Sequence, residues 1–129
     1  MQTIGRFPEA ATGIWDCIHE FVYLAPATCI GTTSVQRRPR VIAYWRKSDP
    51  EYMDGEGAES YKDLIGRIDL TMDILQRRRE RFIVLFTHGQ FIRNFLLVYQ
   101  NPGRPAAEYM AAFRRSKPVR NGQIVEITI

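Results

Sequence analysis

The feature that most constrains this chain is a run of five apolar residues, 82–86, between two segments with helical periodicity. The run holds β-branched and aromatic side chains, and a small polar turn, Thr87-His88-Gly89, follows it. Such a run between helices is typical of a strand that is buried on both faces of a parallel sheet. The pattern therefore predicts a strand over residues 82–87 and an α/β fold.

The segment before this strand carries clear helix signals. Ser60 and Asp63 form a capping-box pattern, in which each side chain can bond to the backbone of the other residue. Apolar residues then recur mostly at spacings of three and four and form one stripe, which consists of Tyr61, Leu64, Ile65, Ile68, Met72 and Leu75. We predict a helix from Ser60 to about Arg79 whose stripe packs in the core.

Two more helices are expected after the strand. Apolar periodicity predicts them over residues 90–99 and, after the Pro102-Gly103 turn, over 106–113. An Asn121-Gly122 turn then introduces a last strand at residues 124–128.

The first part of the chain is less regular. Prolines and glycines interrupt every apolar run before residue 41, which predicts loops with a short strand or helix at residues 15–24. Residues 41–45 can begin another element, which Asp49-Pro50 closes before a long loop leads to Ser60.

The end of the predicted strand is the candidate site. In an open α/β sheet, ligands bind beyond the carboxyl ends of the strands, where His88 and Gly89 stand. The first-turn amides of the next helix favour an anion there, glycine permits a close approach to the backbone, and an imidazole can donate hydrogen bonds or transfer protons. A histidine that only caps the helix or packs is the alternative.

The segment 82–93, Phe-Ile-Val-Leu-Phe-Thr-His-Gly-Gln-Phe-Ile-Arg, adds a family resemblance. With Gly57-Ala58-Glu59-Ser60 and Arg67 before it and Asn121-Gly122 after it, this segment resembles the C-terminal half of the histidine phosphatase superfamily, which has the phosphoglycerate mutase-like fold. Residues 18–24 resemble the region where that family carries an acidic proton donor, and residues 38–45 are similar to bacterial members. The resemblance covers most of the chain and implies a three-layer α/β/α fold with a mostly parallel sheet.

The resemblance assigns roles to three residues. His88 corresponds to the second histidine of the family, which steadies the transferring phosphoryl group, and Glu20 to the acid that protonates the leaving oxygen. The Gly89 amide corresponds to a phosphate contact. The expected catalytic residues are therefore His88 and Glu20, and the expected phosphate-binding residues are His88 and Gly89, although Phe21 and Tyr23 equally suit Glu20 to a half-buried surface position. Positioning and positive charge are what phosphoryl transfer requires.

The nucleophile of the family has no counterpart in these residues. In the family it is a histidine in an Arg-His-Gly motif on the first strand, whereas the two histidines here, His19 and His88, stand in no such motif. We interpret His19 as a surface or loop histidine. The expectation is a single phosphoglycerate mutase-like domain over residues 1–129 that is incomplete at its N-terminus, as in a truncated form, and lacks turnover.

The absent strand has a structural consequence. By resemblance it would lie between residues 82–87 and 124–128, so that two apolar strands would border a vacant position with unpaired backbone groups. Either these strands close up on each other or another chain fills the position. We expect self-association into a homo-oligomer through this open sheet edge.

The charge of the chain bears on its partners. Lys and Arg outnumber Asp and Glu by 18 to 14, and the net charge of +4 favours anions such as phosphate or a small phosphorylated molecule. Arginines gather in two runs, but no aromatic residues interleave with them as base stacking requires, so nucleic acid is the least favoured partner. These runs consist of Arg37, Arg38 and Arg40, and of Arg77, Arg78, Arg79 and Arg81.

Other classes of site and location are constrained by what the sequence lacks. Cys17 and Cys29 have neither metal nor redox spacing and are expected to be reduced thiols. The family chemistry uses a histidine and the sequence holds no cluster of metal ligands, so no metal and no cofactor are expected. No apolar run approaches the roughly 20 residues of a membrane span and residues 1–6 lack a signal-peptide pattern, which predicts a cytoplasmic location and no membrane partner.

Two function classes remain open. The first is a protein of the histidine phosphatase type that, when complete, transfers phosphoryl groups or hydrolyses phosphate monoesters through a phosphohistidine. The second is a non-catalytic interaction or regulatory module that keeps the anion site. Four residues are candidates to line the ligand pocket: Tyr23, Tyr44, Trp45 and Arg46. Packing in the core is the alternative for the three aromatic residues.

Overall fold

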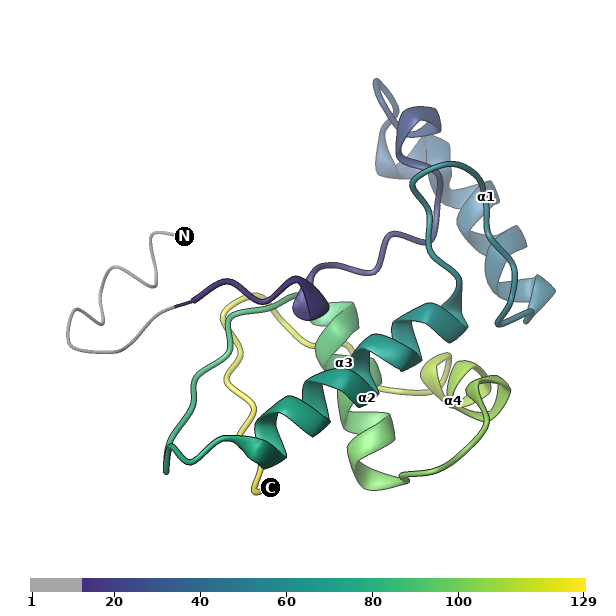
Figure 1. Cartoon of the computed structure of the whole chain (residues 1–129). Coiled ribbons are helices and arrows are strands. Elements are labelled where there is room, and N and C mark those ends of the chain that lie inside the picture. The colour runs from purple at the N-terminus through teal and green to yellow at the C-terminus, as the bar shows by residue number, and fades with distance from the viewer. Residues whose placement is uncertain (1–12) are drawn as a thin grey trace.

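A computed structural model of the chain describes residues 13–129. Two 3₁₀ turns, Asp16–Ile18 and Pro26–Thr28, precede four helices: α1 (Ser34–Lys47), α2 (Tyr61–Arg77), α3 (Gly89–Gln100) and α4 (Ala106–Phe113). In Figure 1, α2, α3 and α4 pack together and α1 lies to one side of them. The sequence-based predictions for the first twelve residues, including the lack of a signal peptide, lie outside the described residues.

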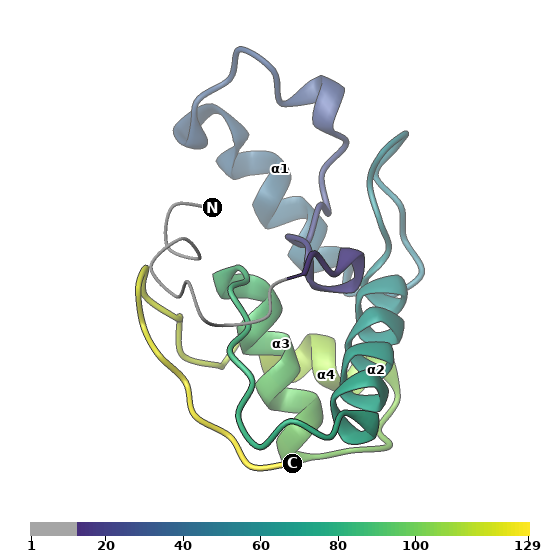
Figure 2. The same cartoon turned by 60° about the vertical axis from the view of Figure 1, so that its left-hand side comes forward.

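The predicted sheet is wrong. Within residues 13–129 there is no β-strand, so the three-layer α/β/α fold with a parallel sheet does not fit. A strand forms only when its N–H and C=O groups pair with a neighbouring strand. The segments 82–87 and 124–128 instead run along one side of the helices, and neither is part of a β-ladder in residues 13–129 (Figure 2).

The helices after residue 60 agree closely with the sequence patterns. The predicted capping box begins α2, because Ser60 Oγ accepts a hydrogen bond from the Asp63 N–H at 3.1 Å and Asp63 Oδ2 accepts one from the Ser60 N–H at 3.3 Å. α2 ends at Arg77, two residues before the predicted end, and α3 and α4 lie where they are expected. The Asn121-Gly122 turn also forms, with the Gln123 N–H donating to the Arg120 carbonyl oxygen at 3.1 Å.

The core lies between α2, α3 and α4. It takes the predicted stripe of α2, in which Tyr61, Leu64, Ile65 and Ile68 are buried and Met72 and Leu75 are partly buried. The Tyr61 hydroxyl donates to Asn94 Oδ1 inside this core, and Asn94 Nδ2 donates to the Gln90 carbonyl oxygen at 2.8 Å. These bonds satisfy polar groups that would otherwise be costly to bury. The apolar partners from the other helices are Phe91, Phe95 and Val98 of α3 and Tyr109, Met110 and Phe113 of α4.

Helix α1 is absent from the predictions, which place only the start of an element at residues 41–45. The helix begins with a second capping box, since Thr33 Oγ1 accepts from the Gln36 N–H at 3.2 Å and Gln36 Oε1 accepts from the Thr33 N–H at 2.9 Å. Pro39 removes one backbone donor inside the helix, which normally disfavours it. Aromatic packing offsets this cost, because Trp45 stacks on Phe113 with ring centroids 4.8 Å apart.

The aromatic residues that were candidates to line a pocket therefore have another role. Tyr44 is buried, and its ring lies 4.7 Å from that of Tyr23 between centroids. Trp45 and Tyr23 are partly buried against the same core, whereas Arg46 is exposed. The three aromatic side chains join α1 to the rest of the fold.

Candidate functional site

His88 lies immediately before α3. It is the N-cap residue of that helix, its side chain makes no capping hydrogen bond, and the side chain is 54% exposed. The amides of the first helical turn have no acceptor within the helix, and the helix dipole adds positive potential at this end. The His88 side chain thus does not cap the helix by a hydrogen bond, and its ring is exposed at a position that favours anions.

Glu20 reaches the same place from the first part of the chain. Its Oε2 lies 3.7 Å from Nδ1 of His88, and its side chain is 46% exposed. The other carboxylate oxygen, Oε1, accepts a hydrogen bond from the N–H of Phe21 at 2.9 Å, which fixes the orientation of the carboxylate. The structure therefore brings together the two residues that the sequence marked as catalytic.

The loop that carries Glu20 is held by side chains from two other elements. Thr87, next to His88, donates its hydroxyl hydrogen to the carbonyl oxygen of Ile18 at 2.6 Å. From α2, Nη1 of Arg67 donates to the carbonyl oxygens of Cys17 at 2.8 Å and His19 at 3.0 Å. These bonds fix the backbone on both sides of residue 18 and, through it, the position of Glu20.

Arg67 is itself held by a carboxylate. Its Nε donates to Oε2 of Glu59 at 3.0 Å, its Nη2 donates to Oε1 of the same residue, and the two side chains are only 14% and 16% exposed. Its guanidinium carbon also lies 5.5 Å from the ring centroid of Phe91, in the first turn of α3. Arg67 therefore contacts the Glu20 loop, the start of α2 and the start of α3.

Sequence reasoning did not assign a role to Arg67, Glu59 or Thr87. Helical periodicity gives no signal for the first two, because Glu59 precedes Ser60, the N-cap of α2, and lies outside the helix that carries Arg67. For Thr87 no local signal exists, since its partner, Ile18, is distant in the sequence.

The packing of the fold around Gly89 leaves little space for a side chain at this position. A Cβ atom at this position would lie 3.3 Å from the carbonyl oxygen of Val119, closer than ordinary van der Waals contact. The segment after α4 therefore occupies the space beside the Gly89 Cα. The amide of Gly89 belongs to the first turn of α3, and the family resemblance predicts that this amide contacts phosphate.

His19 is exposed, and its ring nitrogens face Asp16 and Glu59. Its Nε2 is 3.9 Å from Glu59 Oε1, and its side chain is 53% exposed. This position agrees with its interpretation as a surface or loop histidine.

The two arginine runs are partly occupied by contacts within the chain. Arg40 Nη2 lies 2.7 Å from Asp54 Oδ2, and Arg37 Nη1 donates to the Thr32 carbonyl oxygen at 2.6 Å. In the second run, Arg78 Nη2 lies 2.8 Å from Glu80 Oε1. These three guanidinium groups each have a partner in the fold.

The described part of the chain has neither a cluster of metal ligands nor a helix that could span a membrane. No group of three or more His, Cys, Asp or Glu side chains there is placed to hold a metal ion. Cys17, which is buried, and Cys29, which is partly buried, are both free thiols. None of the helices within residues 13–129 has the length and apolar character needed to cross a membrane.

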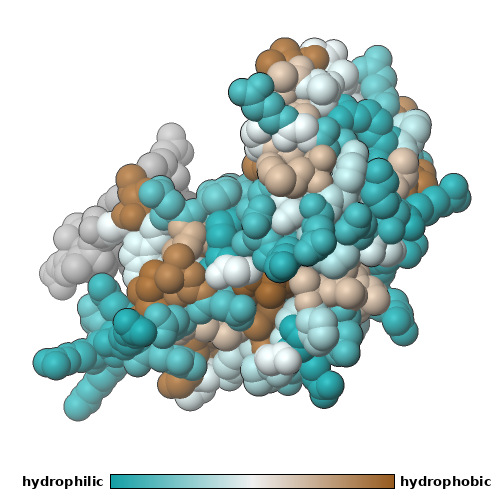
Figure 3. Space-filling view, turned by 45° about the vertical axis from the view of Figure 1, so that its right-hand side comes forward, coloured by the Kyte–Doolittle hydropathy of each residue, from teal (hydrophilic) through white to brown (hydrophobic). Residues whose placement is uncertain are grey.

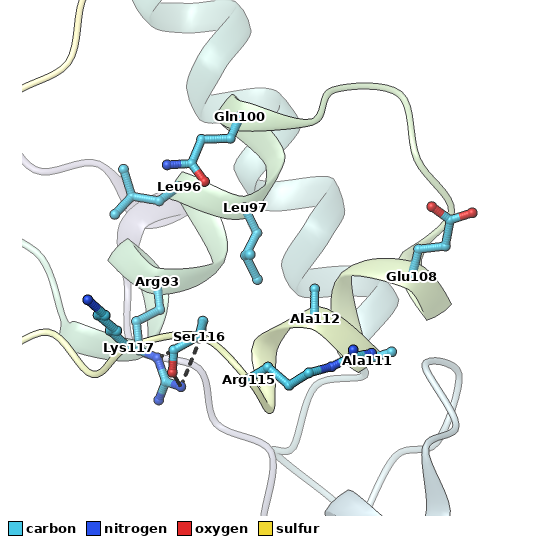
Figure 4. A pocket seen from close by; sticks show the side chains of 10 residues that line it. All are labelled: Arg93, Leu96, Leu97, Gln100, Glu108, Ala111, Ala112, Arg115, Ser116 and Lys117. Atoms are coloured by element: carbon cyan, nitrogen blue, oxygen red, sulfur yellow. Dashed lines mark hydrogen bonds between the residues drawn. The ribbon is translucent and has the colours of Figure 1, made fainter.

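A hollow lies between α3 and α4 (Figure 4). Arg93 on its wall turns toward Ser116, and Nη2 of Arg93 donates to the carbonyl oxygen of Ser116 at 2.9 Å. His88, Gly89 and Glu20 do not line this hollow. The candidate site is therefore a separate, open surface at the start of α3.

Comparison with known proteins identifies the family. A family model described as the histidine phosphatase superfamily (branch 1) matches residues 6–117, which is most of the chain. No curated protein and no solved structure gives a significant match. The chain therefore belongs to the histidine phosphatase superfamily.

Proposed function

We propose that the surface formed by His88, Gly89 and Glu20 binds the phosphoryl group of a small phosphate monoester, or inorganic phosphate. The observation that carries the proposal is the 3.7 Å approach of Glu20 Oε2 to His88 Nδ1 at the N-terminus of α3. The imidazole and the helix amides can donate hydrogen bonds to phosphate oxygens, and the carboxylic acid can protonate a leaving oxygen. In this proposal the site lies in one domain, in a protein of the cytoplasm.

The proposed site binds and positions but does not attack phosphorus. Transfer through a phosphohistidine requires a histidine nucleophile, and the superfamily resemblance assigns that role to an Arg-His-Gly motif that these residues do not contain. In the proposal His88 is used for binding, and Nε2 of His19 lies 3.9 Å from Oε1 of Glu59. The chain is thus proposed to bind phosphate without turnover.

Phosphate binding can be tested on the two histidine rings directly. Because the chain has only His19 and His88, its NMR spectrum holds two sets of imidazole C–H signals, and His88→Gln and His19→Gln assign them. Titration with inorganic phosphate should move the His88 signal and the Gly89 amide signal, with the His19→Gln variant behaving as wild type. The proposal fails if neither signal moves, or if His88→Gln leaves phosphate affinity unchanged.

Turnover is tested separately. A generic phosphate ester and a trap for acid-labile phosphohistidine are applied to this chain and to a superfamily member that carries Arg-His-Gly. We expect no phosphohistidine and no ester hydrolysis above background in this chain. Hydrolysis at a comparable rate would contradict the proposed absence of a nucleophile.

The second candidate function is a non-catalytic module that binds an anionic partner for interaction or regulation. The histidine count favours it, since both histidines are accounted for without a nucleophile. Phosphate binding without phosphohistidine formation supports this candidate, whereas a trapped phosphohistidine removes it.

A further inference from the structure

The hollow between α3 and α4 has an apolar lining. Two leucines of α3 and two alanines of α4 form it, namely Leu96, Leu97, Ala111 and Ala112. Because alanine side chains are short, α4 leaves space beside the leucines of α3, and the hollow measures about 810 Å³. Ligand sites usually measure about 300–1,000 Å³ and are lined mainly by apolar side chains with a few polar groups. The hollow therefore has the size and the lining of a binding site.

Cationic side chains gather at one end of this hollow. Nη2 of Arg93 donates to the carbonyl oxygen of Ser116 at 2.9 Å, so the first half of α3 meets the segment after α4 there. Arg115 and Lys117 are the chain neighbours of Ser116 and line the same hollow. The acidic residue of the lining, Glu108, lies in the first turn of α4, away from Ser116 (Figure 4). The end of the hollow at Ser116 is therefore positively charged.

No carboxylate balances this charge within residues 13–129. Other cationic side chains of the fold, such as Arg40 and Arg67, form ion pairs, but no ion pair there joins Arg93, Arg115 or Lys117 to an acidic residue. The side chain of Arg93 is partly buried, and its hydrogen bonds in that part of the chain go to neutral oxygens. Partial removal of a cation from water is costly without a counter-charge, which an anionic ligand supplies.

Exposed apolar side chains on the other helices do not combine these features. Ile30 precedes α1, Val35 lies on α1 and Leu70 lies on α2, and none of them lines the hollow. On the face that Figure 3 draws, hydrophobic areas are interrupted by hydrophilic ones. Single exposed apolar residues are common on protein surfaces and need no partner. The hollow is the place where a concave apolar lining and an unbalanced charge occur together.

We propose that this hollow binds an acidic amphipathic helix of a partner protein. A groove between two helices accommodates a third helix, whose apolar residues at spacings of three and four face the leucines and alanines. Acidic residues of the partner meet Arg93, Arg115 and Lys117 at the positive end. A second copy of this chain suits the hollow less well, because each copy carries a net charge of +4. Nucleic acid or an anionic membrane would use the cations, but neither places a narrow apolar face between two helices.

Binding of a model peptide tests the proposal. The probe is a fluorescent peptide of about four helical turns with leucines on one face and glutamates on the other, and the same peptide with lysines in place of the glutamates is the control. Fluorescence anisotropy should show saturable binding of the glutamate peptide and roughly tenfold or weaker binding of the lysine peptide. In an NMR titration the amide signals of Leu97 and Ala112 should move and that of Gly89 should not, which separates this site from the proposed phosphate site.

Two pairs of variants locate the binding. Lys117→Glu reverses a charge of the lining, whereas Arg114→Glu makes the same change of net charge at an exposed residue outside the lining. Ala111→Trp fills the hollow, whereas Ala107→Trp adds the same side chain to an exposed position of α4 outside the lining. Lys117→Glu and Ala111→Trp should each weaken binding of the glutamate peptide by roughly tenfold, and their controls by less than about threefold. Far-UV circular dichroism checks that each variant keeps its helices.

The proposal is overturned if the glutamate peptide does not bind, if the lysine peptide binds equally well, or if each lining variant has the same effect as its control. Single-stranded DNA and phosphatidylserine vesicles are the further probes. Tighter binding of either one than of the peptide, with loss of that binding in Ala111→Trp, would assign the hollow to another class of partner and would also overturn the proposal.

Discussion

Replacement of Arg67 by methionine should destabilise the fold strongly. The change removes two bonds to the Glu59 carboxylate and two to the carbonyl oxygens of Cys17 and His19, from a side chain that is 14% exposed. It also leaves Glu59, 16% exposed, without its main partner. Breaking a buried ion pair by removing one partner costs about 3–5 kcal/mol. For Arg67→Met we expect a loss of about 3 kcal/mol in the free energy of unfolding, or roughly 10 °C in melting temperature.

Arg77→Met on the same helix is the matched control. Arg77 pairs with Asp73 at 3.2 Å, but its side chain is 78% exposed. An exposed pair contributes about 0–1 kcal/mol, so this variant should stay within about 0.5 kcal/mol of the wild type. Urea unfolding of both variants, followed by far-UV circular dichroism, measures the difference.

A double-mutant cycle separates the ion pair from the loss of packing. If the unpaired Glu59 carboxylate causes much of the cost, Glu59→Gln added to Arg67→Met should be less destabilising than the sum of the single changes, by about 1–3 kcal/mol. Additive effects, or an Arg67→Met variant as stable as Arg77→Met, would refute the reasoning.

Three further outcomes are expected. Glu20→Gln should raise the affinity for inorganic phosphate about 3–5-fold, because it removes a negative charge worth about 1 kcal/mol of repulsion at the site; unchanged affinity in the NMR titration would contradict this. A hydrogen bond from the backbone N–H of Ala25, together with the positive charge of Arg40, holds the pKa of Asp54 below its usual value. Asp54 therefore stabilises the fold above about pH 4, and this stabilisation is lost as the pH falls through the lowered pKa. Urea unfolding between pH 7 and pH 2 should therefore show a smaller acid-induced loss for Asp54→Asn, and equal losses would argue against the role of Asp54. Ser60→Ala should cost about 1 kcal/mol through the lost N-cap of α2, measured by the same unfolding assay, and a change below about 0.3 kcal/mol would count against the cap.

The helices could be predicted because their signals are local. The capping box at Ser60 and the apolar stripe from Tyr61 to Leu75 are enough to predict both ends of α2 to within two residues, and α2 forms there in the structure. Helix α1 escaped prediction because Pro39 breaks the pattern that a helix usually shows, while the aromatic packing of Trp45 on Phe113 that offsets it is not visible from local sequence. Tertiary contacts here outweigh local preference.

The absence of a sheet could not be predicted from local sequence, because a strand forms only when a second segment pairs with it. The apolar run 82–86 has the composition of a buried strand, but composition says nothing about whether a partner is present. Within residues 13–129 the run is not assigned to a strand, and Phe82 in it is 82% exposed. The run that predicted a buried strand therefore has exposed side chains at Phe82, Val84 and Phe86.

The site was foreseen in part. His88 came from its place between the apolar run and the next helix and from the family resemblance, and Glu20 from the resemblance alone; the structure places their side chains 3.7 Å apart. The bonds that make this approach possible, from Thr87 to Ile18 and from Arg67 to the loop of Glu20, join residues that are distant in the sequence. Only the fold reveals such pairs.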